Sequence, residues 1–342
     1  PRSRCERGVC LVCSSLLSKS DCFVSQWRGE NMLSVQNKEQ YSRNLEEYNK
    51  DGFTVFRNVI DPELIAEARD HLLWLREKFP EFRPEHLHHP LMRDDAFWVR
   101  LVTDSRLLDI AELFLGPDLA CFTAHYICKP PRDGQAVLWH QDGAYWKLSP
   151  MEATSLWLAV DESTAENGCL RVVPGTHKLP LQKLILRDDT PNLLMSSMED
   201  RHVDISSAVN IELQPGDVSV HHPNVIHGSD PNRSSKRRCG LDIAFIGTST
   251  AIESEGLYLN PILVRGAAVP GINQYRAWPS FDADKSMQFA GCESWTRKSQ
   301  EVNARHPEFV PSRHDDEPVQ EIVRRMLARL KSGTTKELRS EA

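Results

Sequence analysis

The chain lacks three features, and each absence excludes a class of protein. No apolar run reaches the roughly 18 residues that a membrane-spanning helix needs, so we expect no membrane span. The net charge is −7 and no stretch interleaves basic with aromatic residues, so a nucleic-acid partner is not expected. No repeat or low-complexity linker divides the chain. The composition, 40% apolar and 26% charged over 342 residues, is typical of a globular protein of enzyme size.

The cysteines also lack a pattern that would indicate a structural metal site or a disulfide framework. Four of the nine lie in the first 22 residues, where Cys10 and Cys13 form a CxxC pair, and the others are scattered singly. No second pair and no histidine pair follows at zinc-finger spacing. Scattered cysteines in a chain of this length indicate reduced thiols, which predicts a cytoplasmic protein.

The first 31 residues differ from the rest of the chain. They are basic and rich in serine, which resembles a transit peptide, and Met32 then opens an ordinary polar lead-in. We therefore expect residues 1–31 to be a disordered or non-native extension, with organelle targeting left open. Residues 32–342 are predicted to form a single domain with N-terminal helices and a C-terminal helix.

The order of elements predicts a mainly β protein with flanking helices. Helices are expected at 36–50, at 61–79, where Asp61 and Pro62 form a start signal, and at 105–116, which Gly116 closes. A β-rich run at 52–60 lies between the first two. From residue 119 onward, short β-rich segments alternate with turn clusters such as PPRDG and QPGD, which favours an antiparallel sandwich or barrel. A long mixed insert is expected at 180–207, and a polar loop beyond residue 280 with a helix at 316–338.

The residues that indicate chemistry are His140 and Asp142, at the end of the predicted strand VLWHQD. Side chains alternate along a strand, so these two point to the same side. With a third ligand such as His227 they would form a facial triad with three open positions, as in non-haem Fe(II) oxygenases. The pair alone is a weak signal among 13 histidines and 48 acidic residues. Spacing does not choose between His227 and its competitors His221 and His222.

Three longer blocks supply the context. Residues 139–146 (WHQDGAYW), 155–178 (including NGCLRVVPGTHK) and 214–238 (including HGSDPNRSSKRR) resemble the phytanoyl-CoA dioxygenase family of Fe(II)/2-oxoglutarate-dependent oxygenases. The order and spacing of the blocks agree with the family over about a hundred residues, and GFTVFRNVIDPELI resembles the family's usual opening. The resemblance implies a double-stranded β-helix core, of the jelly-roll or cupin-like kind.

Carried over residue by residue, the resemblance implies that His140, Asp142 and His227 bind iron. It implies that Arg238 holds the far carboxylate of 2-oxoglutarate, a task that suits a planar and permanently charged guanidinium. Ser229 is placed to donate a hydrogen bond to the same carboxylate, and Trp157 matches a position that lines the co-substrate pocket.

Several neighbouring residues have two interpretations each. Arg237 is the rival of Arg238, because adjacent strand residues face opposite ways and only one can point inward. Lys129 matches a recurrent family lysine but is equally well a solvated or structural charge. Gln141, Tyr145 and Trp146 are candidates to meet the substrate, and packing at the mouth of the barrel explains the two aromatic residues equally well.

The implied activity is oxidation of a small organic metabolite, with an acyl-CoA as one option. Hydroxylation is expected, with dioxygen as co-substrate, succinate and carbon dioxide as products, and ascorbate as a stimulant. Two alternatives stay open: desaturation, cyclisation or epimerisation with the same cofactors, and a β-barrel that binds a metal or ligand without turnover. The partner is a small molecule, and the sequence does not indicate an oligomeric state.

Overall fold

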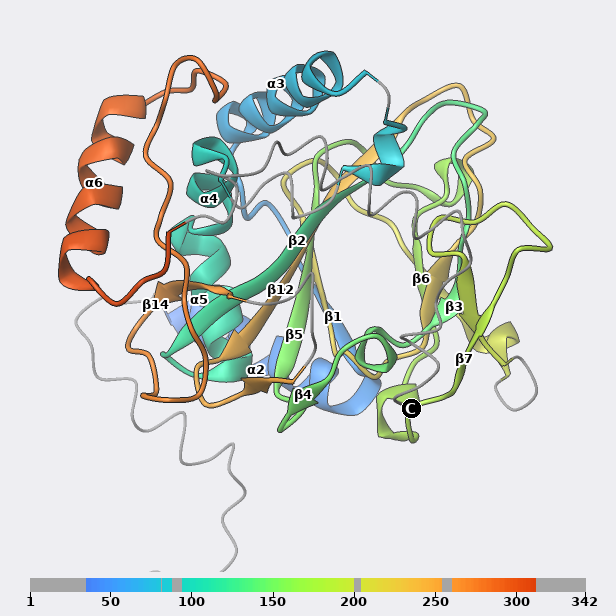
Figure 1. Ribbon diagram of the computed structural model, residues 1–342. Helices are drawn as coiled ribbons and strands as arrows, with labels where there is room; N and C mark the ends of the chain where they lie inside the picture. Colours follow the sequence, from blue (N-terminus) through green and yellow to red (C-terminus); the bar gives the residue numbers. More distant parts are fainter. Residues whose placement is uncertain (1–34, 81, 88–93, 200–203, 254–259, 312–342) are drawn as a thin grey trace, which may run out of the picture. The chain divides into compact units, whose positions relative to one another are not determined.

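The computed structural model describes residues 35–80, 82–87, 94–199, 204–253 and 260–311 (Figure 1). The chain divides into two units, Pro1–Gln40 and Tyr41–Ala342, and the fold described below is that of the second. The predictions for residues 1–31 and for a helix at 316–338 lie outside the described residues. None of the described helices is long and apolar enough to cross a membrane.

A six-stranded sheet forms the centre of the fold. Its strand order is β1-β10-β5-β12-β2-β14, and every neighbouring pair is antiparallel. The long strands β12 and β2 lie side by side in the middle (Figure 1). The strands span Phe53–Phe56 (β1), Val218–His221 (β10), Ala153–Ala159 (β5), Arg238–Gly247 (β12), Leu119–Lys129 (β2) and Ile262–Arg265 (β14).

A second, four-stranded sheet has the order β3-β11-β6-β9 and is also antiparallel throughout. Its strands are Val137–His140 (β3), His227–Ser229 (β11), Leu170–Val172 (β6) and Val209–Ile211 (β9). Two small pairs complete the β structure: β4 (Leu148–Ser149) with β13 (Ala251–Ile252), and β7 (Leu184–Leu186) with β8 (Ser196–Met198). The prediction of a mainly β, antiparallel protein is therefore confirmed.

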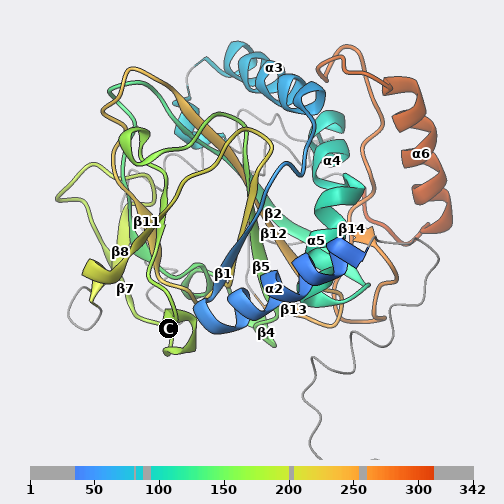
Figure 2. The same cartoon turned by 180° about the vertical axis from the view of Figure 1, so that it is seen from behind.

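The two faces of the large sheet are used differently. On the outer face, Leu241, Ile243 and Phe245 of β12 join one core with buried residues of α3 (Pro62–Lys78), α4 (Ala96–Val102) and α5 (Ser105–Leu115). On the inner face, Trp157 and Ala159 pack against residues of β6 and β9. Figures 1 and 2 show the helices on one side of the large sheet and the smaller sheet on the other. The inner face thus lies between the two sheets.

The helices begin where the sequence predicts. Asp61 caps α3, accepting a hydrogen bond from the backbone N–H of Leu64 at 2.8 Å, and Pro62 is its first residue. Gly116 ends α5 with a φ of 86°, a conformation that favours glycine. The first helix, α2, spans Val35–Asp51 against the predicted 36–50.

One prediction was wrong in the described region. The sequence predicted a polar loop after residue 280, yet Cys292–Arg305 forms helix α6. Its buried residues are only Cys292, Trp295 and Ser299, a stripe too narrow to stand out from a polar background. The indole of Trp295 stacks on Trp278 with ring centroids 5.3 Å apart, so a tertiary contact holds the helix in place.

Candidate metal centre

Two of the predicted ligands come from one extended segment. His140 ends β3, Gln141 has the extended angles φ −119° and ψ 127°, and Asp142 begins a short 3-10 helix. The extended conformation of Gln141 separates His140 and Asp142 by one full alternation, so both side chains point the same way. Nε2 of His140 lies 3.4 Å from Oδ1 of Asp142.

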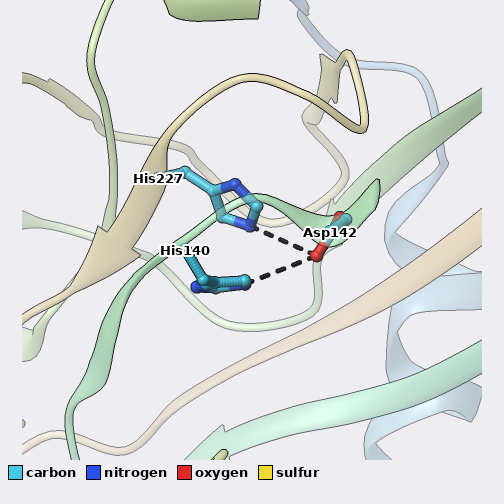
Figure 3. A group of neighbouring side chains, drawn as sticks. All are labelled: His140, Asp142 and His227. Carbon is cyan, nitrogen blue, oxygen red and sulfur yellow. Dashed lines mark ion pairs between the residues drawn. The ribbon is translucent and has the colours of Figure 1, made fainter. Parts of the chain in front are cut away.

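Strand pairing supplies the third group. In the antiparallel pair β11·β3, His227 lies directly opposite His140. Their ring centroids are 4.2 Å apart, and Nε2 of His227 lies 3.5 Å from the same Oδ1 of Asp142 (Figure 3). One ligand atom from each of the three residues lies within 4.8 Å of the others, and all three side chains are largely buried. Donors about 2.1 Å from a shared ion would lie about 3 Å apart at adjacent corners of an octahedron, so the cluster fits a metal.

Backbone contacts set the tautomer of both histidines. Nδ1 of His140 lies 2.8 Å from the carbonyl oxygen of Leu138, and Nδ1 of His227 lies 3.0 Å from that of Val225. A carbonyl only accepts, so each Nδ1 carries the hydrogen and each Nε2 presents its lone pair to the centre of the cluster. Burial, aided by the charge of His140, lowers the pKa of His227 to about 3. His227 is therefore neutral at physiological pH, the form that binds a metal.

Oδ2, the second carboxylate oxygen of Asp142, contacts residues other than His140 and His227. The hydroxyl of Ser155 donates to Oδ2 at 3.0 Å, and Nε2 of His221 lies 3.3 Å from the same atom. Burial alone would raise the pKa of the Asp142 carboxyl, but the surrounding imidazoles of His227, His140 and His221 hold it well below its usual value. Asp142 is thus an ionised carboxylate that turns one oxygen toward the two imidazoles.

A buried guanidinium lies on the inner face of the large sheet. Arg238 begins β12 and is only 1% exposed, and its Cζ lies 4.7 Å from the ring centroid of Trp157. Its Nη1 donates weakly to the carbonyl of Ile127 at 3.4 Å, and its Nε has no hydrogen-bond partner among the described residues. A buried charged donor without an acceptor is costly, so this group is suited to an anion that the protein itself does not supply.

A second buried cation accompanies it. Lys129 is fully buried and is the cross-strand partner of Arg238 on β2. Its ammonium donates to Oγ of Ser229 at 2.6 Å and to the carbonyl of Asp230 at 2.5 Å. The hydroxyl hydrogen of Ser229 is then free to be donated, as the sequence prediction requires. Because Lys129 is buried, the interpretation of this residue as a solvated charge is wrong.

The choice between the neighbouring arginines is settled by their surroundings. Arg237, the residue before β12, forms a two-pronged ion pair with Asp161, with distances of 2.7 and 3.0 Å. Its charge is therefore already compensated. Arg238 is the arginine that faces inward.

The three residues predicted to meet the substrate have contacts within the protein. The amide of Gln141 donates to the carbonyl of Asn224 at 2.8 Å and accepts from the backbone of Gln182 at 2.7 Å, so it ties two loops together beside the cluster. The Tyr145 ring lies edge-on to His140 with centroids 5.6 Å apart. Trp146 packs edge-on against Phe122 at 4.9 Å. Only Tyr145 touches a member of the cluster through its ring, and a substrate role for all three stays a prediction.

Sequence reasoning missed Ser155 and did not place His221. Ser155 and Thr154 are the two hydroxyl residues of an otherwise apolar strand, ATSLWLA, and that contrast is the one signal that could have marked Ser155. His221 was a rival for the third ligand position, and the structure places it next to the cluster, on the far oxygen of Asp142.

Comparison with known proteins identifies the family. A family model described as phytanoyl-CoA dioxygenase (PhyH) matches residues 48–240. Phytanoyl-CoA dioxygenase 1 of Oryza sativa subsp. japonica is 34% identical over 129 residues, 38% of this chain and 45% of the rice protein. The peroxisomal phytanoyl-CoA dioxygenase of Bos taurus is 26% identical over 241 residues, 64% of this chain and 70% of the bovine protein. The alignment with the rice relative thus spans less than half of that protein.

A solved structure shares the fold. The apo form of a non-heme monooxygenase, ThoJ, superposes with a TM-score of 0.61 at 21% identity, covering 82% of this chain and 98% of that one.

Proposed function

The chain belongs to the phytanoyl-CoA dioxygenase family, and from this premise we propose that it is an Fe(II)/2-oxoglutarate-dependent oxygenase that hydroxylates a small organic metabolite. The observation that carries the proposal is the convergence of two imidazoles and one ionised carboxylate oxygen, in a fold that also holds a buried guanidinium with an unused donor. We also propose that the two facing sheets form a double-stranded β-helix, within a single domain that spans residues 32–342.

In this proposal His140, Asp142 and His227 hold the iron. Iron, with 2-oxoglutarate and dioxygen, supplies the oxidising chemistry, which consumes 2-oxoglutarate to succinate and carbon dioxide. With three protein ligands, the iron would keep room for the co-substrates and the substrate. Because Ser155 and His221 occupy Oδ2 of Asp142, the carboxylate binds through one oxygen and does not take a second coordination position.

Arg238 binds the far carboxylate of 2-oxoglutarate. Its unused Nε and its planar fork are matched to a carboxylate, and the indole of Trp157 holds the guanidinium plane in place. Ser229 donates its hydroxyl to the same carboxylate, and Lys129 adds a second positive charge behind Ser229. This arrangement would orient 2-oxoglutarate so that its 2-oxo acid end points toward the iron held by His140, Asp142 and His227.

Burial of the residues around the co-substrate would exclude water from it. Arg238, Trp157 and His227 are each at most 5% exposed, so water is largely excluded around the co-substrate. Exclusion of water strengthens the interaction between the guanidinium and the carboxylate and limits side reactions.

The same residues are compatible with desaturation, cyclisation or epimerisation, because the outcome depends on how the substrate is held relative to the iron. A binding protein without turnover is the alternative from another class. A 2-oxoglutarate-dependent oxygenase needs three metal ligands and an arginine for the co-substrate. This chain has all four side chains, which favours the enzyme over the binding protein.

The test is aerobic incubation with Fe(II), 2-oxoglutarate and metabolite extracts. We expect succinate release and, for one or more metabolites, a mass gain of one oxygen atom, with the His140→Ala variant as the blank. Metabolites that lose two hydrogens or change only in stereochemistry would indicate the alternative oxidations. Succinate at the level of the blank with every extract would favour the binding protein.

A further inference from the structure

An acidic residue stands on the inner face of the large sheet, apart from the metal ligands and the co-substrate arginine. Asp242 lies in the middle of β12, and its strand neighbours Leu241 and Ile243 point into the core beneath the helices. By alternation Asp242 points to the opposite side, the side of Arg238 and Trp157. Asp242 is four positions after Arg238, roughly 13 Å along the strand.

The partners of Asp242 leave one of its oxygens unused. Its Oδ2 lies 3.7 Å from Nε2 of His125, its cross-strand partner on β2, which is longer than a hydrogen bond. Its Oδ1 is buried and has no hydrogen-bond partner among the described residues. A buried acceptor without a donor is rare in folded proteins and indicates a missing partner.

The pair is nevertheless reachable from solvent. The side chain of Asp242 keeps 13% of its exposure and that of His125 keeps 18%, although both lie on central strands covered by helices on the other face. Along its strand the indole of Trp157 covers Gly240 on the same side, whereas Ala244 on the other side of Asp242 has only a methyl group. A ligand between the sheets therefore has access to the carboxylate.

Strand pairing places Asp242 near the metal cluster. Its cross-strand partner on β5 is Trp157, and Ser155, two residues earlier on β5, donates its hydroxyl to Oδ2 of Asp142 at 3.0 Å. Burial raises the pKa of Asp242 to about 6, with the charge of His125 opposing this and the charge of Asp142 adding to it. The carboxyl of Asp242 thus lies on the same sheet as the serine that holds Asp142, and it is still largely ionised at physiological pH.

We propose that Asp242, together with His125, binds a hydrogen-bond donor of the substrate, a hydroxyl or a protonated amine, close to the carbon that is oxidised. This inference rests on the proposed function and narrows its substrate class. A plain hydrocarbon chain, such as the acyl part of a fatty acyl-CoA, has no donor and would leave the carboxylate unpaired. An amino- or hydroxyl-bearing metabolite satisfies it, and such a polar site rejects analogues that lack the donor.

Three probes with one carbon skeleton separate these chemistries: cyclohexylmethylamine, cyclohexylmethanol and cyclohexanecarboxylate. Their binding is measured by calorimetry to protein loaded with Fe(II) and 2-oxoglutarate without oxygen, so that no turnover occurs. We expect the wild type to bind the amine or the alcohol at least about tenfold more tightly than the carboxylate, as expected for a hydrogen bond to a charged group.

Two substitutions identify the source of the preference. Asp242→Leu removes the acceptor and is expected to abolish the preference for either donor. Asp242→Asn keeps an acceptor oxygen but no charge, so it loses an amine preference about tenfold while changing an alcohol preference by threefold or less. Asp284→Asn, which removes an exposed acidic group, is the matched control and should bind all probes as the wild type does.

Equal binding of the three probes to the wild type, binding of none, or a preference that survives in Asp242→Leu overturns the inference. Iron and 2-oxoglutarate binding are titrated in the same samples. Normal binding of both without a donor preference defeats this inference alone, whereas a wild type that binds neither defeats the proposed function. Thermal unfolding shows whether the leucine variant is folded, and the asparagine variant carries the test if it is not.

Discussion

Lys129 and Arg238 are cross-strand partners on β2 and β12, and both cationic side chains are buried. Among the described residues, neither forms an ion pair with a carboxylate. Adjacent buried like charges repel each other, and burial lowers the pKa of Arg238 to about 10, which still leaves it charged at physiological pH. Burial and the charge of Arg238 also lower the pKa of Lys129, well below its usual value. An anionic co-substrate beside the pair would favour the charged form of both side chains.

Replacing Arg238 by lysine is expected to raise the KM for 2-oxoglutarate about 10- to 100-fold, because an ammonium cannot reproduce two parallel hydrogen bonds to a carboxylate. Arg237→Lys is the matched control. Arg237 binds Asp161, so its KM for 2-oxoglutarate should stay at the wild-type value. Initial rates of succinate release at varied 2-oxoglutarate measure both, and equal KM values in the two variants would refute the assignment.

Lys129→Met separates binding from stability. Methionine is apolar and close to lysine in length, so it removes a buried charge without leaving a large cavity. We expect 2-oxoglutarate to bind about tenfold more weakly. Without ligand, loss of the hydrogen bonds to Ser229 and Asp230 lowers stability and removal of a buried ionisable group raises it, so the free energy of unfolding should change by less than about 2 kcal/mol. Calorimetry and urea unfolding provide the two values; unchanged 2-oxoglutarate affinity would make Lys129 purely structural.

Ser155→Ala tests how the carboxylate ligand is oriented. Without the hydroxyl that donates to Oδ2, Asp142 can rotate away from the two imidazoles. We expect iron affinity to fall about 10- to 100-fold, the usual effect of losing a partner of a metal ligand. Ser219→Ala is the control, because Oγ of Ser219 is buried without a hydrogen-bond partner in the described structure. Chelator competition compares the affinities, and an equal effect in both variants would contradict the role given to Ser155.

Gly240→Ala tests whether the indole of Trp157 positions the guanidinium of Arg238. A Cβ at residue 240 would lie 2.0 Å from Cζ2 of Trp157, so the indole must move. Because that indole packs on the Arg238 guanidinium, we expect weaker 2-oxoglutarate binding together with a loss of about 1–3 kcal/mol in stability, the usual cost of overpacking. Intrinsic fluorescence and calorimetry follow the two effects; a variant with wild-type affinity would show that Trp157 does not position the arginine.

The sequence predicted the local features of the fold well. The Asp61 cap, the Gly116 terminus and the common direction of His140 and Asp142 all follow from short-range rules, and the structure has them. Helix α6 was missed because its contact with Trp278 lies outside its own segment. Short-range patterns cannot predict a helix that buries only three of its residues.

The candidate site was only partly predictable for the same reason. Spacing could not separate His227 from His221, and the structure shows why: both imidazoles reach Asp142, one at each oxygen. Which of them faces His140 depends on the pairing of β11 with β3, a long-range event. Asp242 gave no signal at all, since a single acidic residue in a strand has no pattern before its neighbours are known.

Anaerobic equilibrium dialysis with Fe(II) measures whether His227 is the third iron ligand. We expect one ion per chain for the wild type and for His222→Ala, because the imidazole of His222 accepts a hydrogen bond from the Asn224 backbone and is not expected to be a ligand. For His227→Ala we expect a loss of at least about 100-fold in affinity, beyond the usual effect of changing a residue that only supports a ligand. Undiminished iron binding in His227→Ala would show that the three side chains do not form the iron site.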